Sequence, residues 1–238
     1  MGEFIKKLSD LKEFTLDLLY PKYCIGCGVE GCYICQRCLR KLPYLSPLNC
    51  PKCGLPLGSR PFCPRCEEVS ALGGLDSLHS VFRFEGLIRR AVHLLKYNNF
   101  RALAPVLAEQ ACSFLKIVGM RADVIIPVPL HPLRIRERGY NQSSLMAGEL
   151  GKLTGIPAIE GYLVRTVNTP PQVRTSNRDE RVKNVQEAFT CTGTELTGKS
   201  VIIFDDVCTT GSTLNACAAA LKDNLVKGVY GLTLAREV

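Results

Sequence analysis

Four pairs of cysteines with the spacing C-x-x-C constrain this chain more than any other feature of its sequence. They lie in one segment, as Cys24 and Cys27, Cys35 and Cys38, Cys50 and Cys53, and Cys63 and Cys66. One such pair occupies two corners of a tetrahedral Zn²⁺ site, and a second pair completes the site. The sequence therefore predicts two structural zinc centres, in a segment with too little periodicity to build an ordinary core.

The four pairs can share two ions in either of two ways. In a sequential arrangement, residues 24–38 hold one ion and residues 50–66 hold the other, with inner loops of 7 and 9 residues. In an interleaved cross-brace, the first pair joins the third and the second joins the fourth. We favour the sequential arrangement because a shorter loop loses less entropy on closing. Cys32 is surplus to eight ligands and could displace a neighbour.

The cysteine content also indicates a compartment. Thirteen of the 238 residues are cysteine, and the sequence shows no secretory signal and no apolar run long enough to cross a membrane. A cytoplasmic protein without a membrane span is expected, where clustered thiols bind metal more often than they form disulfides. The formal net charge of +8 falls to about +4 once eight thiolates hold two Zn²⁺ ions. That balance permits an anionic ligand or nucleic acid but requires neither.

Three regions follow one another along the chain. Residues 1–20 predict an amphipathic helix, residues 21–70 the double Cys₄ zinc module, and residues 78–238 an α/β domain. Expected strands at 78–84, 124–128, 201–204 and 229–235 alternate with expected helices at 87–96, 102–118, 139–153 and 213–224, with a possible strand at 161–165 and a polar loop at 168–184. This alternation predicts a mostly parallel sheet with flanking helices, whose ligands bind beyond the carboxyl ends of the strands.

A candidate phosphate site follows the apolar strand expected at 201–204. Two carboxylates, Asp205 and Asp206, come first, and a hydroxyl-rich turn into a helix comes next, made of Thr209, Thr210, Gly211, Ser212 and Thr213. Backbone N–H groups at a helix start suit a phosphate, and glycine allows a close approach. The acids would repel that phosphate unless they serve ribose hydroxyls, directly or through Mg²⁺. An ordinary capped turn would explain the hydroxyls but not the adjacent acids.

Basic residues provide candidate partners for a pyrophosphate. Arg134, Arg136 and Arg138 follow the strand expected at 124–128, on the same sheet edge as the acids. A solvated basic loop is the plain alternative. Lys96, at the end of an expected helix, is either a further cation of the site or a lysine placed there by the helix dipole.

Two stretches resemble a known family. The segment FDDVCTTGST, residues 204–213, resembles the signature loop of type I phosphoribosyltransferases, which bind 5-phosphoribosyl-1-pyrophosphate (PRPP). The segment PVPLHPLRIRERGYNQ, residues 127–142, resembles the ComF branch, which is linked to DNA uptake and natural competence. The cysteine module fits that branch, as does the segment 172–189 with Arg178, Arg181 and Asn184. The combined features predict a type I phosphoribosyltransferase-like domain behind a double zinc ribbon.

The resemblance implies roles for particular residues. Asp205 and Asp206 would contact the ribose as the catalytic acids, and residues 209–213 would hold the 5-phosphate. Arg136, Arg138, Gly139 and Tyr140, with Lys96, would lie on the pyrophosphate side. Phosphoribosyl transfer depends mainly on positioning and on Mg²⁺ at the leaving pyrophosphate.

Two functions remain open from the sequence. One is a Mg²⁺- and PRPP-dependent phosphoribosyltransferase with an unknown acceptor. The other is a non-catalytic component of the DNA-uptake machinery that senses PRPP or binds single-stranded DNA, with a ComF-type helicase among its partners. Basic residues and tyrosines of the zinc module could bind single-stranded DNA, or the tyrosines could simply replace a missing core. A PRPP-responsive repressor is a weaker third possibility, because no helix-turn-helix is evident.

Overall fold

The computed structural model describes residues 21–46, 49–50, 52–55, 57, 63, 66, 74–167 and 188–238. The chain divides into two compact units, residues 1–42 and 43–238. The helix expected over 1–20 and the loop expected over 168–184 lie outside the described residues. Among the described residues, no helix has the length and apolar character that a membrane crossing requires.

A repeated backbone motif holds the first C-x-x-C pair of each zinc cluster. In the first unit, Cys24 N donates to Val29 O at 2.8 Å and Gly28 N donates to Cys24 O at 2.8 Å. In the second unit, Cys50 and Gly54 make the equivalent bonds at the same sequence offsets, each again 2.8 Å long. Gly28 and Gly54 both have positive φ, +76° and +71°, a conformation that favours glycine. The two C-x-x-C-G segments are therefore copies of one turn. The only helix in the described part of the first unit is the short α2 (Gln36–Leu39).

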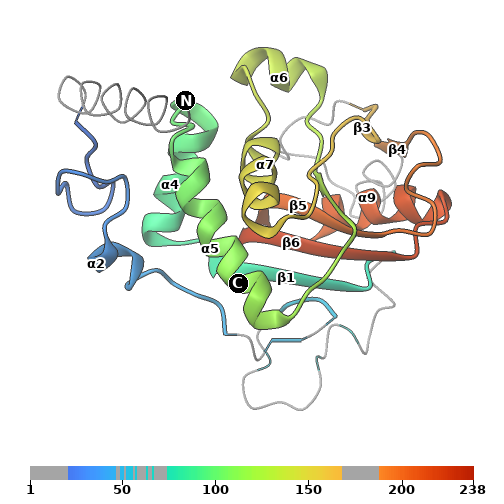
Figure 1. Cartoon of the computed structure of the whole chain (residues 1–238), viewed down its shortest axis with the longest axis horizontal. Helices are drawn as coiled ribbons and strands as arrows, with labels where there is room; N and C mark the ends of the chain where they lie inside the picture. Colours follow the sequence, from blue (N-terminus) through green and yellow to red (C-terminus); the bar gives the residue numbers. More distant parts are fainter. Residues whose placement is uncertain are drawn as a thin grey trace, which may run out of the picture. The chain divides into compact units, whose positions relative to one another are not determined.

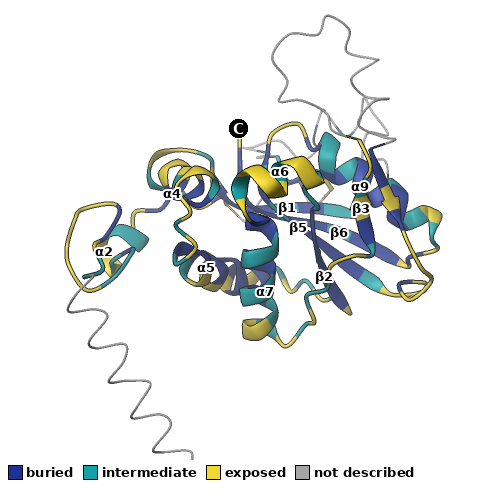
Figure 2. Cartoon of the chain, turned by 90° about the horizontal axis from the view of Figure 1, so that it is seen from above, coloured by how far each residue is buried: buried dark blue, intermediate teal, exposed yellow. Residues whose placement is uncertain are grey.

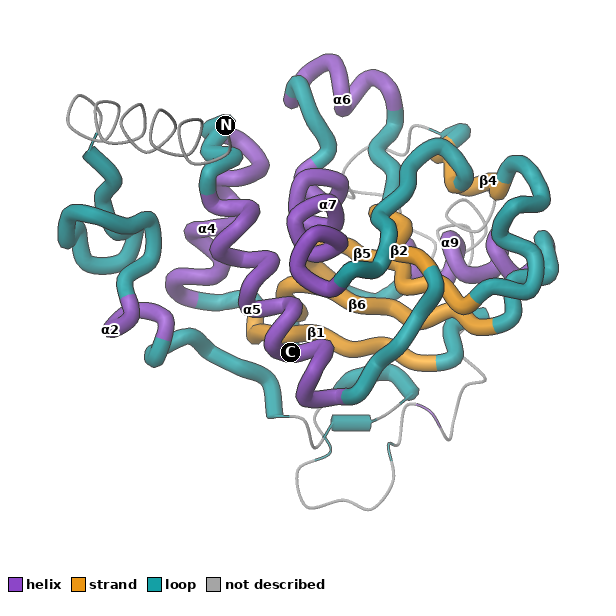
Figure 3. The backbone as a smooth tube through the Cα atoms, viewed as in Figure 1, coloured by secondary structure: helices purple, strands orange, loops and turns teal. Residues whose placement is uncertain are grey.

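The second unit contains a four-stranded, fully parallel sheet. Its strands are β1 (Ser77–Arg83), β6 (Gly228–Arg236), β5 (Ser200–Cys208) and β2 (Val124–Pro127), and they lie in that order across the sheet (Figure 1, Figure 3). Most residues of the two central strands, β5 and β6, are buried and none is exposed, as expected for a sheet covered on both faces. The carboxyl ends of all four strands meet at one edge.

Helices cover the two faces of the sheet. α5 (Leu103–Val118) and α7 (Gln142–Thr154) pack together on one face, and α4 (Gly86–Tyr97) packs against α5. α9 (Ser212–Asp223) covers the other face together with the antiparallel pair β3 (Leu163–Arg165) and β4 (Phe189–Cys191) (Figure 2). The mostly parallel sheet with flanking helices is confirmed.

Two local predictions near the site need correction. The strand expected to end at Phe204 continues to Cys208, because Asp205, Val207 and Cys208 remain paired with β6. Both acids therefore lie within the strand and not after it.

The basic stretch expected to be a loop contains the helix α6 (Pro132–Arg138). Proline occupies its first turn, and the His131 side chain accepts a hydrogen bond from Leu133 N at 3.3 Å. Gly139, with φ +81°, ends α6. The helix predicted to begin at residue 139 therefore begins at Gln142. Strand β4 was not predicted at all.

Candidate functional site

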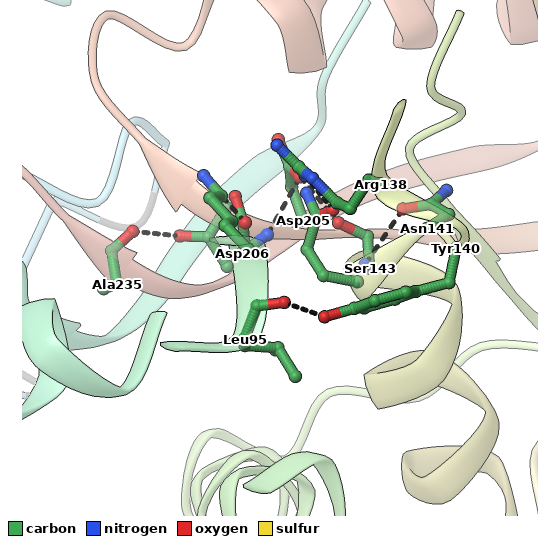
Figure 4. Close-up of polar contacts among 11 residues, drawn as sticks. Leu95, Arg138, Tyr140, Asn141, Ser143, Asp205, Asp206 and Ala235 are labelled. Atoms are coloured by element: carbon green, nitrogen blue, oxygen red, sulfur yellow. Dashed lines mark hydrogen bonds and ion pairs between the residues drawn. The ribbon is translucent and has the colours of Figure 1, made fainter. Parts of the chain in front are cut away.

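The two acids of β5 contact side chains of the helices α4 and α7 at the carboxyl edge of the sheet. Asp206 is buried, with 3% of its surface exposed, and its Oδ2 lies 2.8 Å from Nζ of Lys96 in the last turn of α4. Asp205 Oδ1 accepts hydrogen bonds of 2.9 Å from Ser143 Oγ of α7 and from Asp206 N (Figure 4). Helices α4 and α7 therefore hold the two carboxylates in different polar environments.

The two carboxylates differ in their hydrogen-bond and ion-pair partners, and the pKa of Asp205 is raised. Burial, reinforced by the neighbouring charge of Asp206, raises the pKa of Asp205 to about 7, although Lys96 and the hydrogen bonds from Asp206 N and Ser143 oppose the shift. Asp206 has a lysine directly at its carboxylate, whereas Asp205 has a hydroxyl and an amide. Near neutral pH, Asp205 can accept or release a proton, a property suited to a binding site for a hydroxylated or metal-bound ligand.

Asn141 fixes the position of the Asp205 partner. Its Oδ1 caps α7 by accepting from Ser143 N at 3.0 Å, and its Nδ2 donates to Val128 O at 2.9 Å. The segment after β2 is thereby bound to the start of α7. Asn141 is therefore the N-cap of α7, and the role of Ser143 beside Asp205 was not predicted.

The residues expected on the pyrophosphate side divide into exposed and buried ones. Arg136 is exposed on α6, and Gly139 is exposed where α6 ends. Arg138 Nη1 donates to Gln142 Oε1, and its guanidinium carbon lies 5.5 Å from the centre of the Tyr97 ring. Tyr140 is 7% exposed, and its hydroxyl donates to Leu95 O. Tyr140 therefore ties α4 to the start of α7, Arg138 contacts Gln142 and Tyr97, and Arg136 is exposed to solvent.

The hydroxyl-rich turn leads from β5 into α9. Thr209 and Thr210 are exposed, and Thr210 Oγ1 accepts from Ser212 N at 3.3 Å and lies 2.8 Å from Ser212 Oγ. Gly211 has φ +85° and precedes the first turn of α9 without a side-chain cap. This helix start presents backbone N–H groups and the positive end of the helix dipole at the same edge as the acids. Thr213 lies in that first turn.

A further arginine faces this region from the other side of the sheet. Arg165, at the end of β3, stacks 5.5 Å from the ring centre of Phe189, and burial lowers its pKa while the charge of Asp205 opposes that change. Cys217 of α9 is fully buried, and burial raises its pKa. Neither residue was predicted at the site, because nothing in the short β3 segment marks its arginine as different from a surface residue.

The cysteines form the two expected metal-binding sets. Cys24, Cys27, Cys35 and Cys38 form one, and Cys50, Cys53, Cys63 and Cys66 form the other, with the four Sγ atoms of each set within 4.8 Å of one another. Three of the Sγ–Sγ distances are 3.6, 3.8 and 3.5 Å. Tetrahedral Zn²⁺ with bonds of about 2.3 Å needs separations of about 3.8 Å, so the sets fit structural zinc. The sequential pairing is confirmed, and Cys32 belongs to neither set.

Comparisons with known proteins agree with these features. Residues 15–67 match the family model described as a double zinc ribbon domain. The chain is 32% identical to the DNA utilization protein YhgH of Salmonella typhi, over 81% of this chain and 84% of that protein. It is 27% identical to the competence protein ComFC of Bacillus subtilis (strain 168), over 86% of this chain and 84% of that protein.

Solved structures with a similar fold include phosphoribosyl enzymes. One is the glutamine phosphoribosylpyrophosphate (PRPP) amidotransferase from B. subtilis, with 18% identity and a TM-score of 0.40. The likeness covers 56% of this chain, which spans only 26% of that enzyme. At this level, the likeness says nothing of what the present chain binds.

Proposed function

Because the chain belongs to the ComF family of competence and DNA utilization proteins, we propose that it binds PRPP with Mg²⁺ at the carboxyl edge of its sheet. The observation that carries this proposal is the position of Asp205 and Asp206 in β5, just before the hydroxyl-rich turn and the start of α9. Two neighbouring carboxylates can accept hydrogen bonds from a sugar diol, and a helix start next to them can bind a phosphate on the same sugar.

Each part of the ligand has a group that suits it. Backbone N–H groups and hydroxyls of residues 209–213 hold the 5-phosphate. Asp205 and Asp206 accept hydrogen bonds from the ribose hydroxyls. Arg136 and Arg138 face the pyrophosphate, whose charge suits guanidinium groups.

The 2.8 Å ion pair with Lys96 holds the buried Asp206 carboxylate in place until the ligand binds. Asp205, with its pKa near 7, can give up its proton when the ligand or its metal arrives. The same carboxylate oxygens suit Mg²⁺. When bound, Mg²⁺ would stabilise the charge of the leaving pyrophosphate.

We propose that this site transfers the phosphoribosyl group to an acceptor, most of the rate enhancement coming from positioning. Pyrophosphate release from PRPP, measured with Mg²⁺ and a panel of nucleobase, nucleotide and amine acceptors, tests this directly. Acceptor-dependent release that is lost in Asp205→Asn/Asp206→Asn supports transfer. The matched control is Asp223→Asn, at the far end of α9. If PRPP binds but no acceptor yields pyrophosphate, the site is a sensor and not a transferase.

A second candidate function is single-stranded DNA binding in the cytoplasm during DNA uptake, alongside a ComF-type helicase. One observation favours it: the described part of the first unit exposes Tyr23, Arg37, Arg40 and Lys41, and its one acidic residue is Glu30. Such cations with an exposed ring suit a strand of stacked bases. Fluorescence anisotropy of a labelled oligonucleotide should show salt-dependent binding that weakens in Arg40→Ala/Lys41→Ala. Binding unchanged by that substitution and by Tyr23→Ala would exclude this surface.

A further inference from the structure

A buried arginine ends the central strand β6. Arg236 is 1% exposed, which places it among the largest fully buried side chains. A guanidinium keeps its positive charge in proteins, and an unpaired charge is expensive to bury. Among the described residues, no carboxylate forms an ion pair with Arg236, and its Nε has no hydrogen-bond partner. This charge therefore needs a compensating group.

The group that Arg236 contacts is the loop of the second cysteine set. Arg236 Nη1 donates to Cys53 O. Gly54 packs so closely on the sheet that an added Cβ would lie 2.4 Å from Leu78 O and 3.4 Å from Arg236 Nη1. Cys50, Cys53 and Cys63 are themselves buried. The second cysteine set is thus built into the sheet, directly against the buried guanidinium.

The charge of that metal centre has the required sign. Four thiolates around one Zn²⁺ leave two negative charges. Water can screen the first set, because Cys27 is exposed and Cys35 and Cys38 are only partly buried. In the second set Cys50, Cys53 and Cys63 are buried, so water screens its charge less.

We infer that the Arg236 guanidinium is the built-in counter-charge of the zinc centre at Cys50, Cys53, Cys63 and Cys66. The unpartnered Nε and the bond to Cys53 O both fit a group that orients and neutralises this centre from outside its ligand shell. Arginine and zinc then stabilise each other: each is costly to bury without the other.

Arg236 is also connected, through backbone contacts, to the hydroxyl-rich turn of residues 209–213. Arg236 lies opposite Cys208 in the sheet, Glu237 N donates to Cys208 O at 3.0 Å, and Thr209 begins the turn. Phe84 N donates to Arg236 O at 2.7 Å on the other side. Zinc at the second centre therefore supports the strand ends from which the candidate ligand site is built. This last step rests on the proposed function, whereas the pairing of Arg236 with zinc does not.

Zinc release from the full chain to a coloured chelator tests the inference, because the first centre serves as an internal reference. In Arg236→Met, one zinc per chain should bind about 10- to 100-fold more weakly, while the other stays as in the unsubstituted protein. Arg83→Met is the matched control, since Arg83 is exposed and lies opposite Arg236 in the sheet, and it should leave both zinc ions unchanged. Two unchanged zinc affinities in Arg236→Met would overturn the inference.

Thermal unfolding separates a counter-charge from a simple packing role. Arg236→Met should unfold at a lower temperature than the unsubstituted protein when zinc is bound. After zinc is removed, the difference should vanish or reverse, because the zinc centre that the guanidinium is inferred to balance is then absent. An equal loss of stability with and without zinc would show that Arg236 acts only through packing and its hydrogen bond.

Two milder substitutions cover the case in which Arg236→Met does not fold. Arg236→Lys keeps the charge and should bind both zinc ions as the unsubstituted protein does, whereas the neutral Arg236→Gln should bind zinc at the second centre about 10- to 100-fold more weakly. Equal zinc retention in these two variants would also contradict the counter-charge. None of these measurements uses PRPP, so their outcome is independent of whether the proposed ligand binds.

Discussion

The ion pair between Lys96 and Asp206 yields the sharpest stability prediction. The two charges are 2.8 Å apart, and the exposed fractions of their side chains are 22% and 4%. Removing one partner of a buried pair costs about 3–5 kcal/mol, because the remaining charge stays buried without compensation. Since water reaches part of the Lys96 side chain, we expect Lys96→Met to lower the free energy of unfolding by about 3 kcal/mol, the low end of that range.

An exposed pair in the same protein is the matched control. Lys152 and Glu149 of α7 lie 2.7 Å apart, but their side chains are 72% and 31% exposed. Lys152→Met should therefore cost less than about 1 kcal/mol. Urea unfolding of the ligand-free protein at pH 8, followed by circular dichroism, gives both free energies.

A double-mutant cycle identifies the cause of the loss. In the Asp206→Asn background the carboxylate that pairs with Lys96 is absent, so Lys96→Met should cost much less than it does alone. The reasoning would be refuted if Lys96→Met and Lys152→Met cost the same, or if the effects at positions 96 and 206 simply added.

Three further predictions concern single residues. The pKa of Asp205 is about 7 in the folded chain and about 4 in the unfolded chain. Between pH 4 and pH 7 the folded chain therefore binds a proton at Asp205 that the unfolded chain releases. The free energy of unfolding consequently falls as the pH rises from about 4 to about 7. Asp205→Asn should therefore raise the melting temperature at pH 8 and flatten its pH dependence, and a lower melting temperature at pH 8 would contradict this. Gly54→Ala should cost about 2 kcal/mol or more in urea unfolding, because its Cβ would lie 2.4 Å from Leu78 O. Gly28→Ala, with a similar positive φ and no atom within 4 Å of the added Cβ, should cost only about 1 kcal/mol, and equal losses would count against the close packing. Ser143→Ala removes a donor to Asp205 and should raise the pKa of that carboxyl, detectable as a shifted pH dependence of stability.

Local patterns made much of the fold predictable. Short apolar runs such as 124–128 correctly predicted buried strands, and the short loops between cysteine pairs correctly predicted the sequential zinc sets. Prediction was less successful where tertiary pairing overrides local preference. Aspartate is disfavoured in strands, yet Asp205 remains paired opposite Thr233 in β6, so the strand extends further than its composition suggests.

The sequence contains the signals that mark the ends of helix α6, but the arginines between them were given more weight. Proline in the first turn after His131 and glycine at residue 139 mark the two ends of a helix, yet the stretch was expected to be a loop whose arginines meet a pyrophosphate. A run of charged residues indicates that these side chains are exposed to solvent. It does not indicate whether the backbone that bears them is a helix or a loop.

The site itself was predictable only in part. The acids and the hydroxyl-rich turn are contiguous, so one segment reveals them. Ser143 lies 62 positions from Asp205, and Arg236 lies 183 positions from Cys53. Such partners share no local pattern, and a single sequence does not connect them.

Isothermal titration calorimetry with PRPP and Mg²⁺ tests the central claim most directly. We predict one binding site per chain for the unsubstituted protein, with binding lost in Asp205→Asn/Asp206→Asn and retained in Asp223→Asn. Absence of binding to the unsubstituted protein, or equal binding in the variant that lacks both acids, would contradict the proposed ribose phosphate site.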